Sequence, residues 1–157
     1  MLSRMVEHDV TALIEELRSS RDALLGLLDR LSETRIYRPT ERDGWTVKHE
    51  LAAVAAHDAV LLHVIEELAR RPALSEIDVS RLRGEAMLAA KELRLAPLRE
   101  RLAAGLQRLT EALRRHDQTL ARPVSIAGQP AAAVAALLRE HAERTRSCSG
   151  RVEAVIA

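Results

Sequence analysis

The stretch Asp43–Leu62, DGWTVKHELAAVAAHDAVLL, constrains the fold most, because it predicts a helix that is apolar on nearly every side. Thr46 is a good N-cap, since its hydroxyl can accept a hydrogen bond from an unpaired backbone N–H of the first turn. Trp45 precedes it and is placed to pack back near Leu51 as a hydrophobic staple. The many alanines of this stretch allow other helices to approach closely, so we expect it to lie among them.

Apolar residues recur at alternating spacings of four and three along four long segments, which is typical of helices that bury one face. These segments cover residues of about 3–32, 46–70, 97–115 and 130 to the end of the chain. Aromatic residues make up 1% of the chain, so its core is built from Leu, Ala, Val and Ile. Leu and Ala favour helices, and runs of β-branched residues are absent.

The breaks between these segments complete the predicted architecture. Residues 72–79 and 116–129 are expected to be loops, and a shorter helix is expected at about 80–94. Pro97 and Pro130 are placed at the first turn of the helices that follow, where proline is favoured. The prediction is an all-α fold, an antiparallel up-down four-helix bundle with an extra short helix before the third long helix. Residues 1–157 are expected to form a single domain.

Composition excludes several function classes. A net charge of +1 gives no field that attracts nucleic acid, and single-strand binding needs aromatic platforms that this chain lacks. The longest apolar region is too short to span a bilayer, and the N-terminus lacks the apolar core of a signal peptide. A single cysteine, Cys148, excludes an internal disulfide and fits a reducing compartment. We therefore expect a cytoplasmic protein that binds neither nucleic acid nor membrane.

Three of the long helices carry polar residues on the apolar stripe, each near its own midpoint. These residues are Ser20 on the first helix, Asp58 on the second, and His141, Thr145 and Cys148 on the last. Helix midpoints meet at one depth in an up-down bundle, so a polar cluster is predicted there, with His57 beside it. An unpaired buried charge is costly, and His141 is the nearest candidate partner for Asp58.

This cluster has two interpretations. It is a small pocket whose Asp58–His141 pair serves in acid/base chemistry or incomplete metal ligation, or it is a polar pair that fixes how the helices register. Residue types alone favour the second. A hydrolase triad of Ser20, His141 and Asp58 would lack a nucleophile elbow, and Cys148 on a core face is expected to be inert. No catalytic residue is assigned. The candidate ligand-binding residues are His57, Asp58, His141 and Thr145.

The run GWTVKHELAAVAAHD resembles the second-helix signature of the DinB-like superfamily. That superfamily includes the N-terminal domains of mycothiol-dependent maleylpyruvate isomerases and related thiol transferases. Its pattern is a Gly/Trp pair before a capped helix, an apolar helix with one His, and an acidic residue about a turn later. Three other features agree with this pattern: a long first helix, a third helical segment that Pro97 interrupts after a loop, and a His near the centre of the last helix. The resemblance implies a DinB-like bundle.

The resemblance also implies a divalent metal, such as zinc or nickel, held by one His of the second helix and two of the last. The matching positions here are Ala53, His141 and Thr145, so only His141 supplies a nitrogen, and Asp58 matches the acidic position. His57 lies one turn from Ala53, a shift of about 5.4 Å. Metal–nitrogen bonds of about 2.0–2.1 Å do not tolerate that shift. We therefore predict no metal site.

Three functions remain open. The first is a bundle with a degenerate metal site that binds a small ligand or a partner. The alternative is a divalent-metal-dependent thiol S-transferase or isomerase of mycothiol or bacillithiol type, which would bind a low-molecular-weight thiol. The third is a purely structural dimeric module. The resemblance implies a homodimer, and the substitutions at Ala53 and Thr145 favour the first function.

Overall fold

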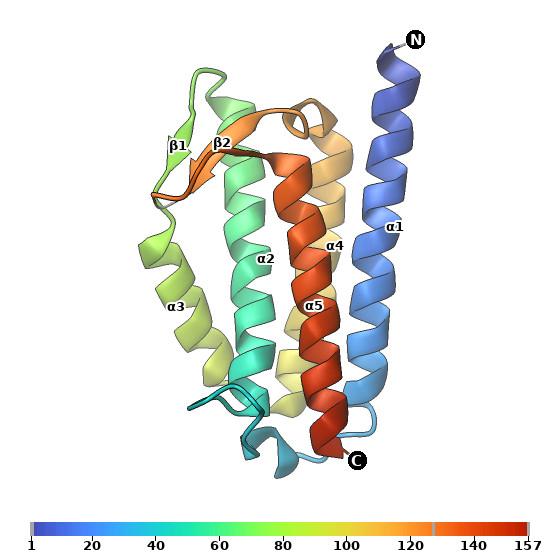
Figure 1. Ribbon diagram of the computed structural model, residues 1–157, viewed down its shortest axis with the longest axis vertical. Helices are drawn as coiled ribbons and strands as arrows, with labels where there is room; N and C mark the ends of the chain where they lie inside the picture. The colour runs from blue at the N-terminus through green and yellow to red at the C-terminus, as the bar shows by residue number, and fades with distance from the viewer. Residues whose placement is uncertain (1, 127, 157) are drawn as a thin grey trace.

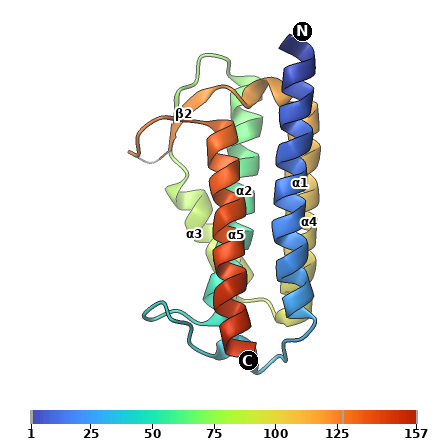
Figure 2. The ribbon, with the colours of Figure 1, turned by 45° about the vertical axis from the view of Figure 1, so that its right-hand side comes forward.

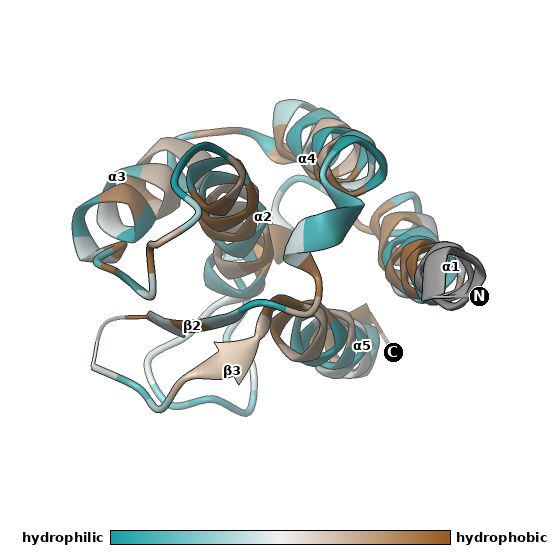
Figure 3. Cartoon of the chain, turned by 90° about the horizontal axis from the view of Figure 1, so that it is seen from above, coloured by the Kyte–Doolittle hydropathy of each residue, from teal (hydrophilic) through white to brown (hydrophobic). Residues whose placement is uncertain are grey.

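Four long helices lie side by side in the computed structural model, which describes the backbone of residues 2–126 and 128–156 and the side chains of residues 9–126 and 128–156. They are α1 (Leu2–Leu28), α2 (Val47–Arg70), α4 (Leu95–Arg115) and α5 (Val134–Ile156) (Figure 1). The shorter α3 (Ser80–Lys91) lies against α2, outside the ring that the long helices form when the molecule is seen from above (Figure 3). The predicted bundle with an extra short helix is confirmed.

Helix direction alternates along the chain from α1 to α5 (Figure 2). Because α3 takes one of the five passes, α1 and α5 run parallel to each other, as do α2 and α4. The all-α fold is as predicted, but the strict up-down order expected of the four long helices is not found. The packing shows the same arrangement. One apolar cluster joins the starts of α1 and α5 to the ends of α2 and α4, and a second cluster joins the opposite ends.

The N-terminus of α2 is fixed by the residue that the sequence predicted. The hydroxyl of Thr46 accepts a hydrogen bond from the backbone N–H of His49, and Nδ1 of His49 accepts one from the backbone N–H of Thr46. This is a capping box in which His takes the place usually held by Glu or Gln. It begins the helix that carries both Asp58 and His57.

Two predicted helix boundaries and two predicted loops are wrong. The first helix ends at Leu28 rather than residue 32, and the last begins at Val134 rather than Pro130. The supposed loops contain two short strands, β1 (Glu76–Ile77) and β2 (Pro123–Ile126), and a third, β3 (Ala132–Ala133), lies where the last helix was expected to begin. Strand β2 pairs in parallel with β1 and antiparallel with β3. This pairing takes up the residues that precede Val134 and so delays the start of α5.

A polar layer separates the two apolar clusters of the core. Its buried members are Ser20, Arg21, Asp58, His141 and Thr145, which come from α1, α2 and α5. In the described part of the chain, no helix is both long enough and apolar enough to cross a membrane. The polar layer is enclosed by the long helices, as predicted from the position of its residues near the helix midpoints.

Helix α4 approaches Asp58 at Gly105. A Cβ atom added there would lie 2.5 Å from Oδ2 of Asp58, too close for any real contact. Gly26 on α1 has no atom within 4 Å of its added Cβ. The two glycines therefore separate the effect of helix propensity from the effect of this close approach.

We expect Gly105→Ala to lower the free energy of unfolding by about 1–3 kcal/mol, because the methyl group displaces a buried carboxylate. Gly26→Ala is the matched control and should raise it by about 1 kcal/mol through helix propensity alone. Urea denaturation measures both. A Gly105→Ala variant as stable as Gly26→Ala would contradict the close packing of α4 on Asp58.

Candidate functional site

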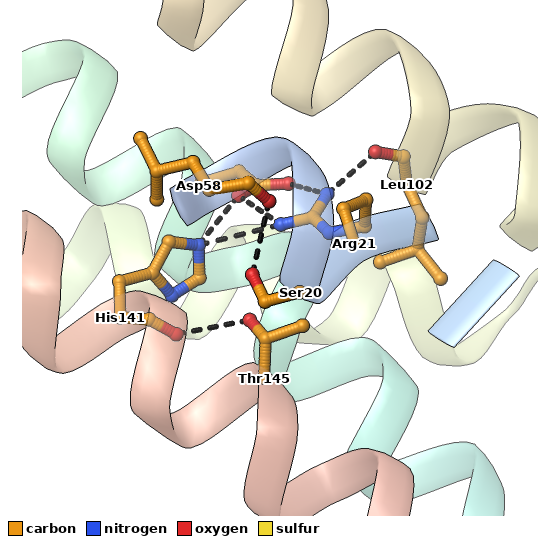
Figure 4. Close-up of polar contacts among 7 residues, drawn as sticks. Ser20, Arg21, Asp58, Leu102, His141 and Thr145 are labelled. Carbon is orange, nitrogen blue, oxygen red and sulfur yellow. Dashed lines mark hydrogen bonds and ion pairs between the residues drawn. The ribbon is translucent and has the colours of Figure 1, made fainter. Parts of the chain in front are cut away.

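The carboxylate of Asp58 has two partners in the polar layer (Figure 4). Arg21 binds it with both terminal nitrogens, Nη1 at 2.8 Å from Oδ2 and Nη2 at 2.7 Å from Oδ1. Nε2 of His141 lies 2.7 Å from Oδ1. All three residues are buried, with exposed fractions of 3% or less. The predicted Asp58–His141 contact is present, but Arg21, which the sequence analysis missed, holds the charge.

Hydrogen-bonding chemistry fixes the roles in this layer. An ionised carboxylate only accepts hydrogen bonds, so Nε2 of His141 is protonated and its N–H donates a hydrogen bond to Oδ1 of Asp58. Nη2 of Arg21 lies 3.4 Å from this nitrogen, and since both are donors the two are simply in contact. Nη1 of Arg21 also donates to the carbonyl oxygen of Leu102 on α4, at 2.5 Å. The layer thereby joins all four long helices.

The electrostatics of Asp58 favour its charged form. Burial by itself would raise the pKa of its carboxyl group, but the positive charge of Arg21 opposes this. Hydrogen bonds from His141 and Arg21 act in the same direction as that charge, and the net pKa is lowered below the ordinary value of 3.8. Asp58 is therefore an ionised structural group at neutral pH rather than a proton donor.

The two hydroxyl groups of the layer bond within their own helices. Ser20 Oγ donates to the carbonyl oxygen of Leu17, and Thr145 Oγ1 donates to that of His141, each at 2.9 Å. Because the Ser20 hydroxyl is turned to its own backbone, the geometry gives no support to a triad of Ser20, His141 and Asp58. Thr145 is likewise used by α5 itself.

A cavity of about 800 Å³ lies between α2, α3 and α5 and continues to the loop before α2. His57 and Ala53, one turn apart on α2, form part of its wall together with His141 on α5. Of the four predicted ligand-binding residues, the structure places His57 and His141 at the cavity, while Asp58 and Thr145 are not in its wall. Whether any of the four binds a ligand stays a prediction.

His57 lies in the cavity wall, and its pKa is strongly lowered. Its ring packs on that of His141, with ring centroids 4.8 Å apart. The pKa of His57 is lowered to about 3, with burial as the largest cause and the charges of His141, Arg144 and Arg83 acting in the same direction. The nearby Asp58 has a smaller opposite effect. His57 is therefore neutral at neutral pH, and its imidazole can donate and accept hydrogen bonds in the cavity wall.

The residues at the positions matched to metal ligands do not fit a three-nitrogen site. Ala53 has no donor atom, the Thr145 hydroxyl is bonded to its own helix, and Nε2 of His141 is bonded to Asp58. Among the described side chains, no group of three His, Cys, Asp or Glu residues is arranged to hold a metal ion. That the protein binds no metal nevertheless stays a prediction.

Two further residues of the cavity wall, Cys148 and Glu50, are not available as a nucleophile or a free base. Cys148 is buried, and burial raises the pKa of its thiol to about 12, so it is not a thiolate. Glu50 is 1% exposed and was not singled out from the sequence. Its Oε2 pairs with Nη2 of Arg151 at 3.0 Å and with Nη1 of Arg42 at 3.5 Å.

The missed residues had a signal in the sequence. Arg21 lies four residues after Leu17 and three before Leu24, so it fits the apolar stripe as well as Ser20 does. Glu50 fits the stripe of α2 in the same way. A long charged side chain that keeps the spacing of a buried stripe can indicate a buried ion pair.

Comparison with known proteins identifies the fold. No family model and no curated protein sequence matches the chain. The solved structure of mycothiol-dependent maleylpyruvate isomerase matches with a TM-score of 0.74 and 18% identity, over 91% of this chain and 60% of the isomerase. A histidine-to-alanine mutant of that enzyme gives a TM-score of 0.77 at the same identity and coverage. An uncharacterised protein from Clostridium difficile 630 has a TM-score of 0.71 and 12% identity, over 92% of this chain and 94% of its own.

These likenesses confirm the fold that the GWTVKHELAAVAAHD run predicted, since the chain shares it with mycothiol-dependent maleylpyruvate isomerase. At such low identities they show the fold alone. The chain spans 60% of the isomerase's length, so the activity named for that enzyme does not transfer with the fold.

We expect Arg21→Gln to cost about 3–5 kcal/mol of stability, because it leaves a buried carboxylate without its charge partner. His141→Gln should cost less, about 1–2 kcal/mol, since Arg21 still holds Asp58 and only one hydrogen bond is altered. Urea denaturation at neutral pH measures both variants.

The double variant Arg21→Met/Asp58→Leu is the control, because it replaces the whole pair by apolar groups. It should recover most of the stability that Arg21→Gln loses. Equal losses in Arg21→Gln and His141→Gln would show that Arg21 is not the principal partner of Asp58.

Proposed function

We propose that this DinB-like bundle is a small-molecule-binding module whose site is the cavity between α2, α3 and α5. The observation that supports this most is the cavity itself, whose volume of about 800 Å³ is in the range of small-ligand sites. Its wall combines apolar side chains with two imidazoles, those of His57 and His141. Such a wall can both bury a ligand body and fix its orientation.

The polar layer favours binding over chemistry. The carboxylate of Asp58 is held by three charge-assisted hydrogen bonds from Arg21 and His141, so it is not free to accept a proton from a substrate. His141 belongs to the polar layer and also lies in the cavity wall, next to His57. We propose that these two histidines position a ligand, with the polar layer keeping α2 and α5 in register behind them.

The alternative is a divalent-metal-dependent thiol S-transferase or isomerase. Its support is the likeness of fold to an isomerase named as mycothiol-dependent. A low-molecular-weight thiol is small enough for the cavity, but Ala53 and Thr145 supply no nitrogen for a metal. Zinc or nickel found in stoichiometric amount in the purified protein, and lost on His141→Ala, would favour this alternative over our proposal.

The predicted homodimer and the predicted cytoplasmic location remain part of the proposal. The location is compatible with the one cysteine being a free, buried thiol, as expected in a reducing compartment. Light scattering of the purified protein decides the oligomeric state.

Trp45 makes ligand binding directly measurable, because it is the only tryptophan of the chain and lies in the cavity wall. We expect the uncharged probe N-phenyl-1-naphthylamine to bind the protein and to quench Trp45 by energy transfer. Ala53→Phe fills the cavity and should weaken this binding at least tenfold.

Gly84→Leu is a second blocking variant, since Gly84 lines the cavity and an added Cβ there meets no atom within 4 Å. Gly26→Ala, remote from the cavity, is the control and should bind the probe like the wild type. Circular dichroism confirms that each variant is folded. Probe binding that persists unchanged in both blocking variants would place the ligand site elsewhere.

A further inference from the structure

The wall of the cavity carries an excess of positive charge. Four arginines and a single glutamate contribute to it, and the arginines come from three separate segments. They are Arg42 before α2, Arg83 on α3, and Arg144 and Arg151 on α5. The net charge of the whole chain is only +1, so this concentration of cations is local.

Two of these arginines are already paired with the one glutamate of the wall. Glu50 pairs with Arg151 and Arg42, and its Oε1 accepts a hydrogen bond from the hydroxyl of Thr40 at 3.2 Å. Arg42 also stacks on Trp45, with its guanidinium carbon 3.8 Å from the ring centroid. These contacts use the charge of Glu50 and hold both of its arginines in place.

The remaining cations, Arg83 on α3 and Arg144 on α5, both line the cavity. Both side chains are exposed at its mouth. Within residues 9–126 and 128–156, no ion pair involves Arg83. Arg144 pairs with Glu140 at 2.6 Å, but both partners are more than half exposed, and such surface pairs contribute little. Two guanidinium groups are therefore available to an incoming anion.

The charges of Arg83 and Arg144 act on His57 of the cavity wall, although both side chains are exposed. After burial and the charge of His141, they are the next causes that lower the pKa of His57. A bound anion would meet these two cations and a neutral imidazole, with no carboxylate of the wall left unpaired to repel it.

The rest of the wall is apolar. Trp45, Val54, Met87 and the alanines at 53 and 56 supply most of this surface. A planar guanidinium matches a carboxylate with two parallel hydrogen bonds, which makes arginine well suited to hold an organic acid. Apolar wall and cationic mouth together define an amphipathic ligand.

We infer that the ligand of this cavity is a small organic acid, whose carboxylate is held between Arg83 and Arg144 and whose apolar body lies against Trp45 and Met87. This inference rests on the proposed binding function and adds the chemical class of the ligand. It makes Arg83 and Arg144 the residues that determine specificity.

The test compares acids with amides of the same shape by the fluorescence of Trp45. Phenylacetate and hexanoate are titrated against phenylacetamide and hexanamide at constant ionic strength, with inorganic phosphate as an anion that lacks an apolar body. We expect the acids to bind at least tenfold more tightly than the amides and than phosphate. In the double variant Arg83→Gln/Arg144→Gln, this preference should fall to less than twofold.

The matched control is Arg101→Gln/Arg108→Gln, which removes the same charge from exposed positions on α4, outside the cavity wall. It should retain the full preference. Acids and amides that bind equally would overturn the inference, as would a preference that survives in Arg83→Gln/Arg144→Gln or phosphate binding as tight as that of the acids.

The outcome for the inference is separable from that for the proposed function. If N-phenyl-1-naphthylamine binds the cavity but the acids bind no more tightly than the amides, the proposed binding function is supported and the inferred organic-acid ligand is wrong. If neither the uncharged probe nor the acids bind, both are wrong.

Discussion

The ion pair of Arg21 and Asp58 is the interaction on which the rest of the structure depends. A carboxylate enclosed by helices costs several kcal/mol unless a cation and hydrogen bonds compensate for its lost hydration. Here the compensation involves every long helix. Helix α1 supplies Arg21, α5 supplies His141, and α4 contributes the carbonyl of Leu102 and the space left by Gly105. These contacts form only when the four helices have one alignment along their axes. The ion pair therefore fixes that alignment, which the two apolar clusters on either side specify less strictly.

The same arrangement shapes the candidate site. Successive residues of α2 point in different directions, so Asp58 enters the core while His57 lines the cavity beside α3. The core residue is committed to structure, and the cavity residue is held neutral by burial. His141 belongs to both, because its Nε2 bonds Asp58 while its ring packs on His57. The polar layer thus lies behind one wall of the cavity, and the opposite wall includes residues of α3. Helix α3 is a short helix outside the bundle (Figure 3).

Sequence periodicity predicted the long helices, the Thr46 cap and the mid-depth polar layer, because each follows from local spacing along one helix. It did not predict the three short strands, since strands of two to four residues are defined by pairing with other segments rather than by their own sequence. Arg21 was missed because an arginine is ordinarily solvated, and its burial depends on a carboxylate 37 residues away. The cavity could not be predicted either, because its volume depends on how α3 packs against α2.

The ionisation of Asp58 is the most direct test of this account. Carbon-13 NMR of the side-chain carboxyl groups, with the Asp58 signal assigned by its loss in Asp58→Asn, follows the titration of this single group in the folded protein. The account predicts a pKa below the ordinary value of 3.8, because the charge of Arg21 and the hydrogen bonds from Arg21 and His141 outweigh the effect of burial. An Asp58 that titrates at or above 3.8 would contradict it, since burial would then prevail and the ion pair would not hold the bundle together.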